Sequence, residues 1–181
     1  MNWDKFYDIV IAGKKDGWEV AKQLENNKTV LLINHNFKLY DDNGNKGSFS
    51  WMLNRKVEEN AQHSRAQGSY GRVLMGGLGI GYDAFMLSYD PNVTSIVIVE
   101  KEKEVIDLVK KYITHPKINI IHDRILHYMQ TTKENFDTTY FDIFPDSPTL
   151  FPKEVNILTK ESKRLGANKI LFWMRYKPLE L

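Results

Sequence analysis

From Gly71 onward, the sequence alternates between short runs rich in β-branched residues and segments with helical periodicity. This alternation is typical of βα units, in which helices connect the parallel strands of one sheet. It therefore predicts an α/β fold with a mostly parallel sheet and helices on both of its faces. Strands are expected at residues 72–75, 95–100, 118–122, 138–142 and 169–175, and helices near 81–89, 102–113, 124–131 and 152–164.

The first of these strands ends in a glycine-rich turn. Gly77, Gly79 and Gly81 alternate after an apolar run, and residues 83–88 have a helical pattern. Glycine lets the backbone curl tightly and approach a ligand, so the order strand, turn, helix is typical of nucleotide binding. The GxGxG spacing is not the dinucleotide fingerprint and no Walker lysine follows, which favours an adenosine ligand without a phosphate chain. A tight strand-to-helix turn without a ligand would use the same residues.

Carboxylates end the next three expected strands. Glu100 ends the second strand, Asp123 follows the third, and Asp142 ends the fourth. Ligands of open parallel sheets bind outside the carboxyl ends of the strands. Glu100 is our candidate for accepting hydrogen bonds from both hydroxyls of a ribose. The alternative is a solvated Glu100 that caps the following helix.

Residues 1–70 have a weaker pattern. Strands are expected at residues 6–12, 29–34 and 37–41, and residues 18–24 fit either a strand or a helical turn. A helix is expected at residues 48–62. We therefore expect a small N-terminal antiparallel β unit and a connecting helix over residues 1–70, followed by the α/β domain over residues 71–181.

Composition excludes several classes of function. The chain has no cysteine, which excludes disulfides, thiolate catalysis and cysteine-ligated metal sites. None of the histidines is spaced for a metal site, so we expect no metal. The net charge is only +2 and no basic run is long, so nucleic acid binding is not indicated. No apolar run approaches the ~18 residues of a membrane span and no signal peptide pattern is present, so we expect a cytoplasmic protein with no membrane association.

Four segments resemble successive motifs of class I S-adenosylmethionine-dependent methyltransferases, and more narrowly of the spermidine synthase group. They are residues 73–81, 98–100, 122–123 and 136–142. The resemblance implies a Rossmann-like domain behind a small N-terminal β unit. It also implies that the cofactor is S-adenosylmethionine or its decarboxylated form.

The resemblance assigns roles to the strand-end residues. It implies that the three glycines line the methionine part of the cofactor, that Glu100 holds its ribose, and that Asp123 with Arg124 borders the adenine. Asp142 matches the carboxylate that helps aminopropyltransferases take a proton from the attacking amine.

Two further residues are candidates from their positions. Tyr82 directly follows the glycines and is expected to contact the cofactor. Asp146 is either a substrate residue, paired with Asp142 in acid–base chemistry, or a cap of the helix after Pro152.

The sequence also departs from the spermidine synthase pattern. Ile80 stands where aminopropyltransferases carry an aspartate, and the segment from Asp142 to Asp146 displaces their second aspartate and proline. The few residues after Arg175 are too short for the helix and strand pair that normally end the fold. We therefore expect a C-terminally shortened domain, with its sheet edge covered in a homodimer.

Three functions remain open from the sequence. The first is a transferase that acts on a small-molecule acceptor, which the sequence does not identify, with Asp142 as general base. The second is a regulatory protein that binds an adenosyl ligand without catalysis. The third is an enzyme that cleaves S-adenosylmethionine without an acceptor.

Overall fold

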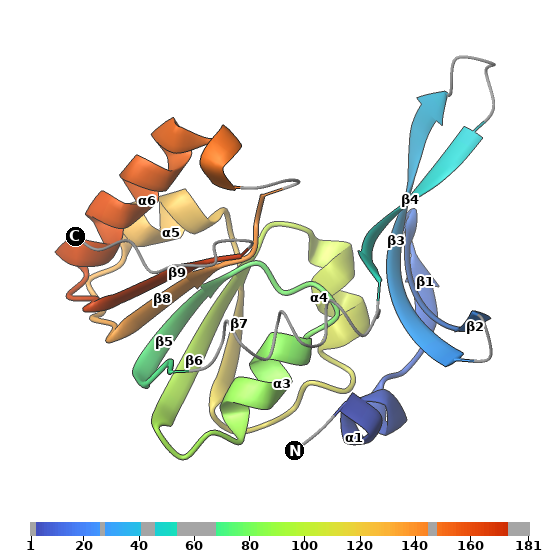
Figure 1. The fold of residues 1–181 in the computed structure, drawn as a ribbon, viewed down its shortest axis with the longest axis horizontal. Helices are drawn as coiled ribbons and strands as arrows, with labels where there is room; N and C mark the ends of the chain where they lie inside the picture. Colours follow the sequence, from blue (N-terminus) through green and yellow to red (C-terminus); the bar gives the residue numbers. More distant parts are fainter. Residues whose placement is uncertain (1–2, 26–27, 41–45, 54–67, 145–147, 174–181) are drawn as a thin grey trace.

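The computed structural model describes residues 3–25, 28–40, 46–53, 68–144 and 148–173. These residues form a parallel sheet with helices on both faces and a separate antiparallel sheet near the N-terminus (Figure 1). Among the helices of the described ranges, none combines the length and the apolar character needed to cross a membrane.

The parallel sheet has five strands in the order β7-β6-β5-β8-β9. The first strand, β5, is central, and the chain adds β6 and β7 on one side before it crosses to β8 and β9 on the other. The strand order therefore reverses beside β5, where open α/β sheets bind ligands. All five predicted strands are confirmed: β5 (Gly71–Gly76), β6 (Val93–Glu100), β7 (Ile118–His122), β8 (Thr138–Phe141) and β9 (Lys169–Phe172).

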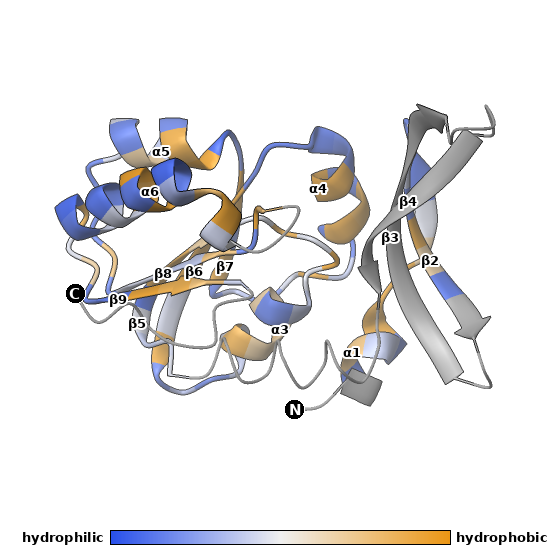
Figure 2. Ribbon diagram, turned by 45° about the horizontal axis from the view of Figure 1, so that its top comes forward, coloured by the Kyte–Doolittle hydropathy of each residue, from blue (hydrophilic) through white to orange (hydrophobic). Residues whose placement is uncertain are grey.

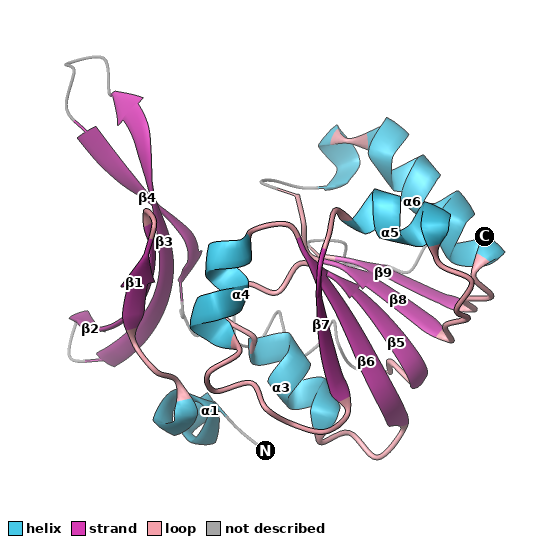
Figure 3. Cartoon of the chain, turned by 180° about the vertical axis from the view of Figure 1, so that it is seen from behind, coloured by secondary structure: helices cyan, strands magenta, loops and turns pink. Residues whose placement is uncertain are grey.

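Helices cover both faces of this sheet, as the alternating pattern predicted (Figure 3). Successive residues of β5 point to opposite faces, so Val73 and Met75 join one core cluster and Leu74 joins the other. Figure 2 shows that hydrophobic residues concentrate in the strands between the two helical layers. The first layer holds α3 (Tyr82–Ser88) and α4 (Lys103–Val109), and the second holds α5 (Ile125–Thr131) and α6 (Pro152–Arg164), which follows the short 3-10 turn η1 (Pro148–Leu150).

The N-terminal unit is antiparallel, as predicted, with the strand order β1-β2-β3-β4. The two strands expected at residues 29–34 and 37–41 form one long strand with an irregular register between His35 and Leu39. The bounds are β1 (Gly13–Lys15), β2 (Trp18–Glu25), β3 (Lys28–Tyr40) and β4 (Lys46–Leu53).

Two predictions for this unit were wrong. The strand expected at residues 6–12 is replaced by the helix α1 (Trp3–Ile9). Phe6 in this helix and Val10 directly after it are both buried, four residues apart. The helix expected from Ser48 begins instead as strand β4, because residues 46–53 pair with β3 and pairing outweighs local pattern. The rest of that expected helix, residues 54–62, lies outside the described residues.

Helix α4 lies between the two sheets and joins them (Figures 1 and 3). The Lys15 ammonium of β1 lies 2.5 Å from the Asp107 carboxylate of α4. From α1, the ring of Phe6 lies 5.2 Å from that of Phe85 in α3 and is fully buried. The N-terminal unit is therefore attached to the face of the parallel sheet that carries α3 and α4.

Strand β9 borders the sheet, and residues 174–181 beyond it lie outside the described residues. The expected homodimer stays a prediction, because the structure holds one chain.

Candidate functional site

Four of the predicted site residues lie at the carboxyl ends of the strands of the parallel sheet. Backbone hydrogen bonds place them: Gly77 donates to Val99 at 3.0 Å, Asp142 donates to Gly76 at 2.9 Å, and Asp123 donates to Glu100 at 3.1 Å. The glycine turn therefore lies between the ends of β6 and β8, where the strand order reverses. A doubly wound sheet binds its ligand at the carboxyl ends of its strands, beside this reversal.

The glycine turn has no space for a side chain at Gly77 or at Gly81, because a different neighbour fills the space at each position. Gly77, Gly79 and Gly81 all have positive φ, at 94°, 51° and 84°. A Cβ atom at position 77 would overlap the carbonyl oxygen of Asp142, and one at position 81 would lie 2.6 Å from Cγ1 of Ile113. The turn is thus pressed against the backbone that follows β8 and against the segment that follows α4.

Glu100 is buried, with 8% of its surface exposed, and each of its carboxylate oxygens accepts a backbone hydrogen bond. The Leu78 N–H donates to Oε2 at 2.9 Å, and the Glu102 N–H donates to Oε1 at 2.9 Å. Glu100 is therefore not solvated, and it connects the glycine turn to the start of α4. Each oxygen accepts more than one hydrogen bond in proteins, so this carboxylate is also able to receive a ribose hydroxyl.

Asp123 lies at the start of α5 and accepts several hydrogen bonds. Its Oδ1 accepts the Arg124 N–H at 2.7 Å, and its Oδ2 lies 2.7 Å from Nδ1 of His127. The hydrogen bond from His127 holds the pKa of Asp123 below its usual range. Arg124 is exposed beside it.

His127 was not predicted as a site residue. The sequence signal for it was its position four residues after Asp123, because residues with this spacing are neighbours on a helix surface. His122, in contrast, is hydrogen-bonded through Nε2 to the Lys101 carbonyl at 3.1 Å, which fixes it at the end of β7.

Asp142 is half-buried and directly follows β8. Its N–H donates to the Gly76 carbonyl, so its backbone is fixed against the glycine turn. Ile143 follows with 37% of its surface exposed. Asp146 lies outside the described residues, so its role stays a prediction.

Two side chains of the turn point into the core. Tyr82 is 2% exposed, and its ring lies edge-on to that of Phe6 at 5.2 Å. Ile80 is 1% exposed and belongs to the same cluster. The side chain of Tyr82 therefore packs in the core, and its predicted contact with the cofactor stays a prediction.

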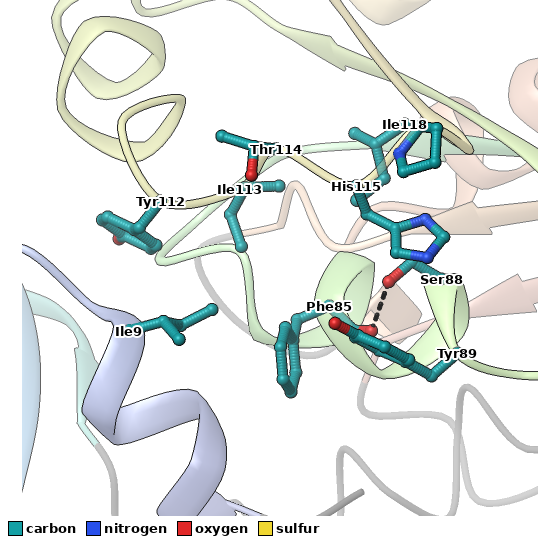
Figure 4. A pocket seen from close by; sticks show the side chains of 10 residues that line it. Ile9, Phe85, Ser88, Tyr89, Tyr112, Ile113, Thr114, His115 and Ile118 are labelled. Atoms are coloured by element: carbon teal, nitrogen blue, oxygen red, sulfur yellow. Dashed lines mark hydrogen bonds between the residues drawn. The ribbon is translucent and has the colours of Figure 1, made fainter.

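A cavity of about 330 Å³ lies away from the carboxyl ends of the strands and from the candidate site (Figure 4). It is formed between α1, the end of α3 and the segment before β7, and its lining includes Ile9, Tyr89 and His115. Since Ile118 begins β7, the cavity lies near the amino ends of the strands. In the described ranges, no group of three histidine or acidic residues is arranged to hold a metal ion.

Solved structures match this chain, whereas no protein-family model and no curated protein matches its sequence. The spermidine synthase from Thermotoga maritima superposes with a TM-score of 0.55 at 15% identity, over 84% of this chain and 53% of that one. A spermidine synthase in complex with the transition state analogue AdoDATO gives a TM-score of 0.53 at 11% identity, over 86% of this chain and 63% of that one. This chain therefore spans only about half to two thirds of their length.

These similarities define the class of fold. The strand order and both superpositions show the Rossmann-like fold of class I S-adenosylmethionine-dependent methyltransferases. The covered share of this chain is larger than residues 71–181 alone, so the likeness to the spermidine synthases extends into the N-terminal β unit.

Proposed function

We propose that this protein binds S-adenosylmethionine, or its decarboxylated form, at the carboxyl ends of β5 to β8 and transfers a group from it to a small molecule. The observation that carries the proposal is the buried Glu100 carboxylate, fixed to the glycine turn by the Leu78 N–H. A carboxylate held in this position suits the two hydroxyls of a ribose, which neutral side chains match less well.

The neighbouring residues fit the rest of an adenosyl ligand. The turn from Gly77 to Gly81 exposes backbone to the methionine part, and Asp123 borders the adenine together with Arg124. The turn holds no basic side chain for a phosphate chain, which suits a sulfonium compound. Oligomeric state and cellular location are part of the proposal only as expectations: a homodimer in the cytoplasm.

Asp142 is the proposed general base. When bound, the sulfonium supplies an electrophilic carbon and leaves as a neutral thioether. The Asp142 carboxylate orients the acceptor and takes the proton that the acceptor loses as its lone pair forms the new bond. The hydrogen bond from the Asp142 N–H to Gly76 holds the backbone of Asp142 beside the turn that would carry the sulfonium.

A second function, binding without catalysis, is favoured by Ile80. Where aminopropyltransferases carry an aspartate, this chain has an apolar side chain that is buried in the core. A diamine acceptor needs anionic partners for its ammonium groups, and this position offers none. Aminopropyl transfer is therefore the transferase activity that the site supports least.

Calorimetric titration tests the proposed ligand. The probes are S-adenosylmethionine, its decarboxylated form, methylthioadenosine and NAD. We expect the adenosyl compounds to bind and NAD to bind far more weakly. Binding of NAD alone would contradict the proposal, whereas binding of an adenosyl compound without turnover on a panel of acceptors would favour the second function.

A further inference from the structure

Tyr112 makes a buried hydrogen bond to the backbone of the glycine turn. Its hydroxyl donates to the carbonyl oxygen of Ile80 at 3.0 Å. Tyr112 is 6% exposed and Ile80 is 1% exposed, so water does not compete for this bond. Tyr112 lies beyond the end of α4, on the connection between β6 and β7, and the bond therefore links two separate βα units.

The residue after Tyr112 contacts the same turn. Cγ1 of Ile113 lies 2.6 Å from the position that a Cβ atom at Gly81 would occupy. The Gly81 N–H donates to the Leu78 carbonyl at 2.9 Å, and the Gly81 carbonyl accepts the Phe85 N–H at 2.9 Å. The end of the turn is thus fixed by hydrogen bonds and has no space to move toward Ile113.

Helix α1 also packs against Tyr112, through the side chain of Phe6. The buried ring of Phe6 lies 6.3 Å from that of Tyr112 and 5.2 Å from that of Phe85. In Figure 4, the side chains of Tyr112, Ile113 and Phe85 lie around Ile9 of α1. The ring of Tyr112 thus packs against Phe6, while its hydroxyl bonds to the Ile80 carbonyl.

The hydroxyl of Tyr112 is not needed for packing. Phenylalanine would fill the same space, and a buried hydroxyl is costly unless it is hydrogen-bonded. Burial raises the pKa of Tyr112, so the hydroxyl remains a protonated donor at physiological pH. The bond to Ile80 is therefore the property that tyrosine adds at this position.

We propose that Tyr112 is a positioning residue of the adenosyl site. By fixing the Ile80 carbonyl, it sets the orientation of the peptide groups between Gly79 and Gly81 before the ligand binds. Glycine-rich backbone loses much conformational freedom when it is ordered, and ordering it beforehand strengthens binding. The inference rests on the proposed function, because the turn is taken to line the methionine part of the ligand.

The variant Tyr112→Phe tests this role, with Tyr128→Phe as its matched control. Tyr128 is also buried but lies on α5, in the opposite core cluster. We expect Tyr112→Phe to weaken the affinity for S-adenosylmethionine about tenfold, as the loss of one buried hydrogen bond implies. We also expect faster hydrogen exchange of the Gly81 amide. Tyr128→Phe should change neither measurement, because the Tyr128 hydroxyl makes no hydrogen bond to the described residues.

An unchanged affinity and an unchanged exchange rate of Gly81 in Tyr112→Phe would overturn the inference. If the wild type binds no adenosyl compound, the proposed function fails, and exchange at Gly81 in the unliganded protein still decides whether Tyr112 orders the turn. If Tyr112→Phe does not fold, the hydroxyl proton of Tyr112 is followed by NMR in the wild type. Slow exchange of this proton with water would support its bond to Ile80, and fast exchange would overturn the inference.

Discussion

The amide of Leu78 donates a hydrogen bond of 2.9 Å to the carboxylate of Glu100, which links the glycine turn to the end of the neighbouring strand. This bond lies inside the protein, and the second carboxylate oxygen is held by the start of α4. The same side chain therefore joins the turn to the start of α4 at the carboxyl end of β6.

Replacing Glu100 with glutamine tests its charge at nearly constant size. The glutamine carbonyl can accept only one of the two backbone N–H groups, and its NH₂ group would face the other donor. We expect affinity for S-adenosylmethionine to fall about 10- to 100-fold, together with a stability loss of about 1–3 kcal/mol. Calorimetry and urea denaturation measure the two effects. The control is Glu102→Gln, whose side chain lies on the surface near Lys101; equal affinities of the two variants would contradict the role of Glu100.

Replacing Gly77 with alanine tests the contact between the turn and the end of β8. The φ of 94° strains any other residue, and the new Cβ would overlap the Asp142 carbonyl. We expect a loss of about 2–4 kcal/mol in the free energy of unfolding, or displacement of the turn with loss of ligand binding. The control is Gly13→Ala, whose Cβ would meet only the flexible end of Leu108 at 3.3 Å. A Gly77→Ala variant as stable as this control, with ligand binding intact, would show that the turn is looser than described.

The pair of Asp123 and His127 predicts a dependence on pH. The hydrogen bond from His127 lowers the pKa of Asp123 in the folded protein, so its stabilisation is present above the ordinary carboxyl pKa of about 3.9 and is lost as the pH falls through the lowered value. In His127→Ala, the pKa of Asp123 should rise toward its ordinary value. Titration by NMR of the carboxyl carbon measures it. His115→Ala is the control, because that ring accepts a hydrogen bond from the Lys117 N–H instead; an unmoved pKa in His127→Ala would exclude the pair as its cause.

Replacing Asp142 with asparagine tests the proposed general base. We expect the ligand to bind with nearly unchanged affinity and kcat to fall about 10²- to 10⁴-fold, because a positioned base contributes that much. Turnover with an identified acceptor and calorimetry on the same preparation separate the two effects. Unchanged turnover would remove Asp142 from the mechanism.

The parallel sheet was predictable because its buried strands are β-branched runs bounded by turn residues, and the strand-end carboxylates follow from the same pattern. Helix α1 was missed because residues 6–12 are apolar at both periods, and the packing of Phe6 against distant aromatic rings favours the helix. Strand β4 was missed because its partner β3 is needed to define it. The hydrogen bond from Tyr112 to Ile80 joins residues far apart in the sequence, so no local sequence pattern predicts it.

A crystal structure with bound methylthioadenosine tests the central claim most directly, because this compound carries the adenosine and the sulfur without a reactive group. We predict that its ribose hydroxyls lie within hydrogen-bonding distance of the Glu100 carboxylate, with the sulfur beside the turn from Gly77 to Gly81. A ligand seated away from Glu100, such as in the cavity beside Tyr89 and His115, would contradict the account.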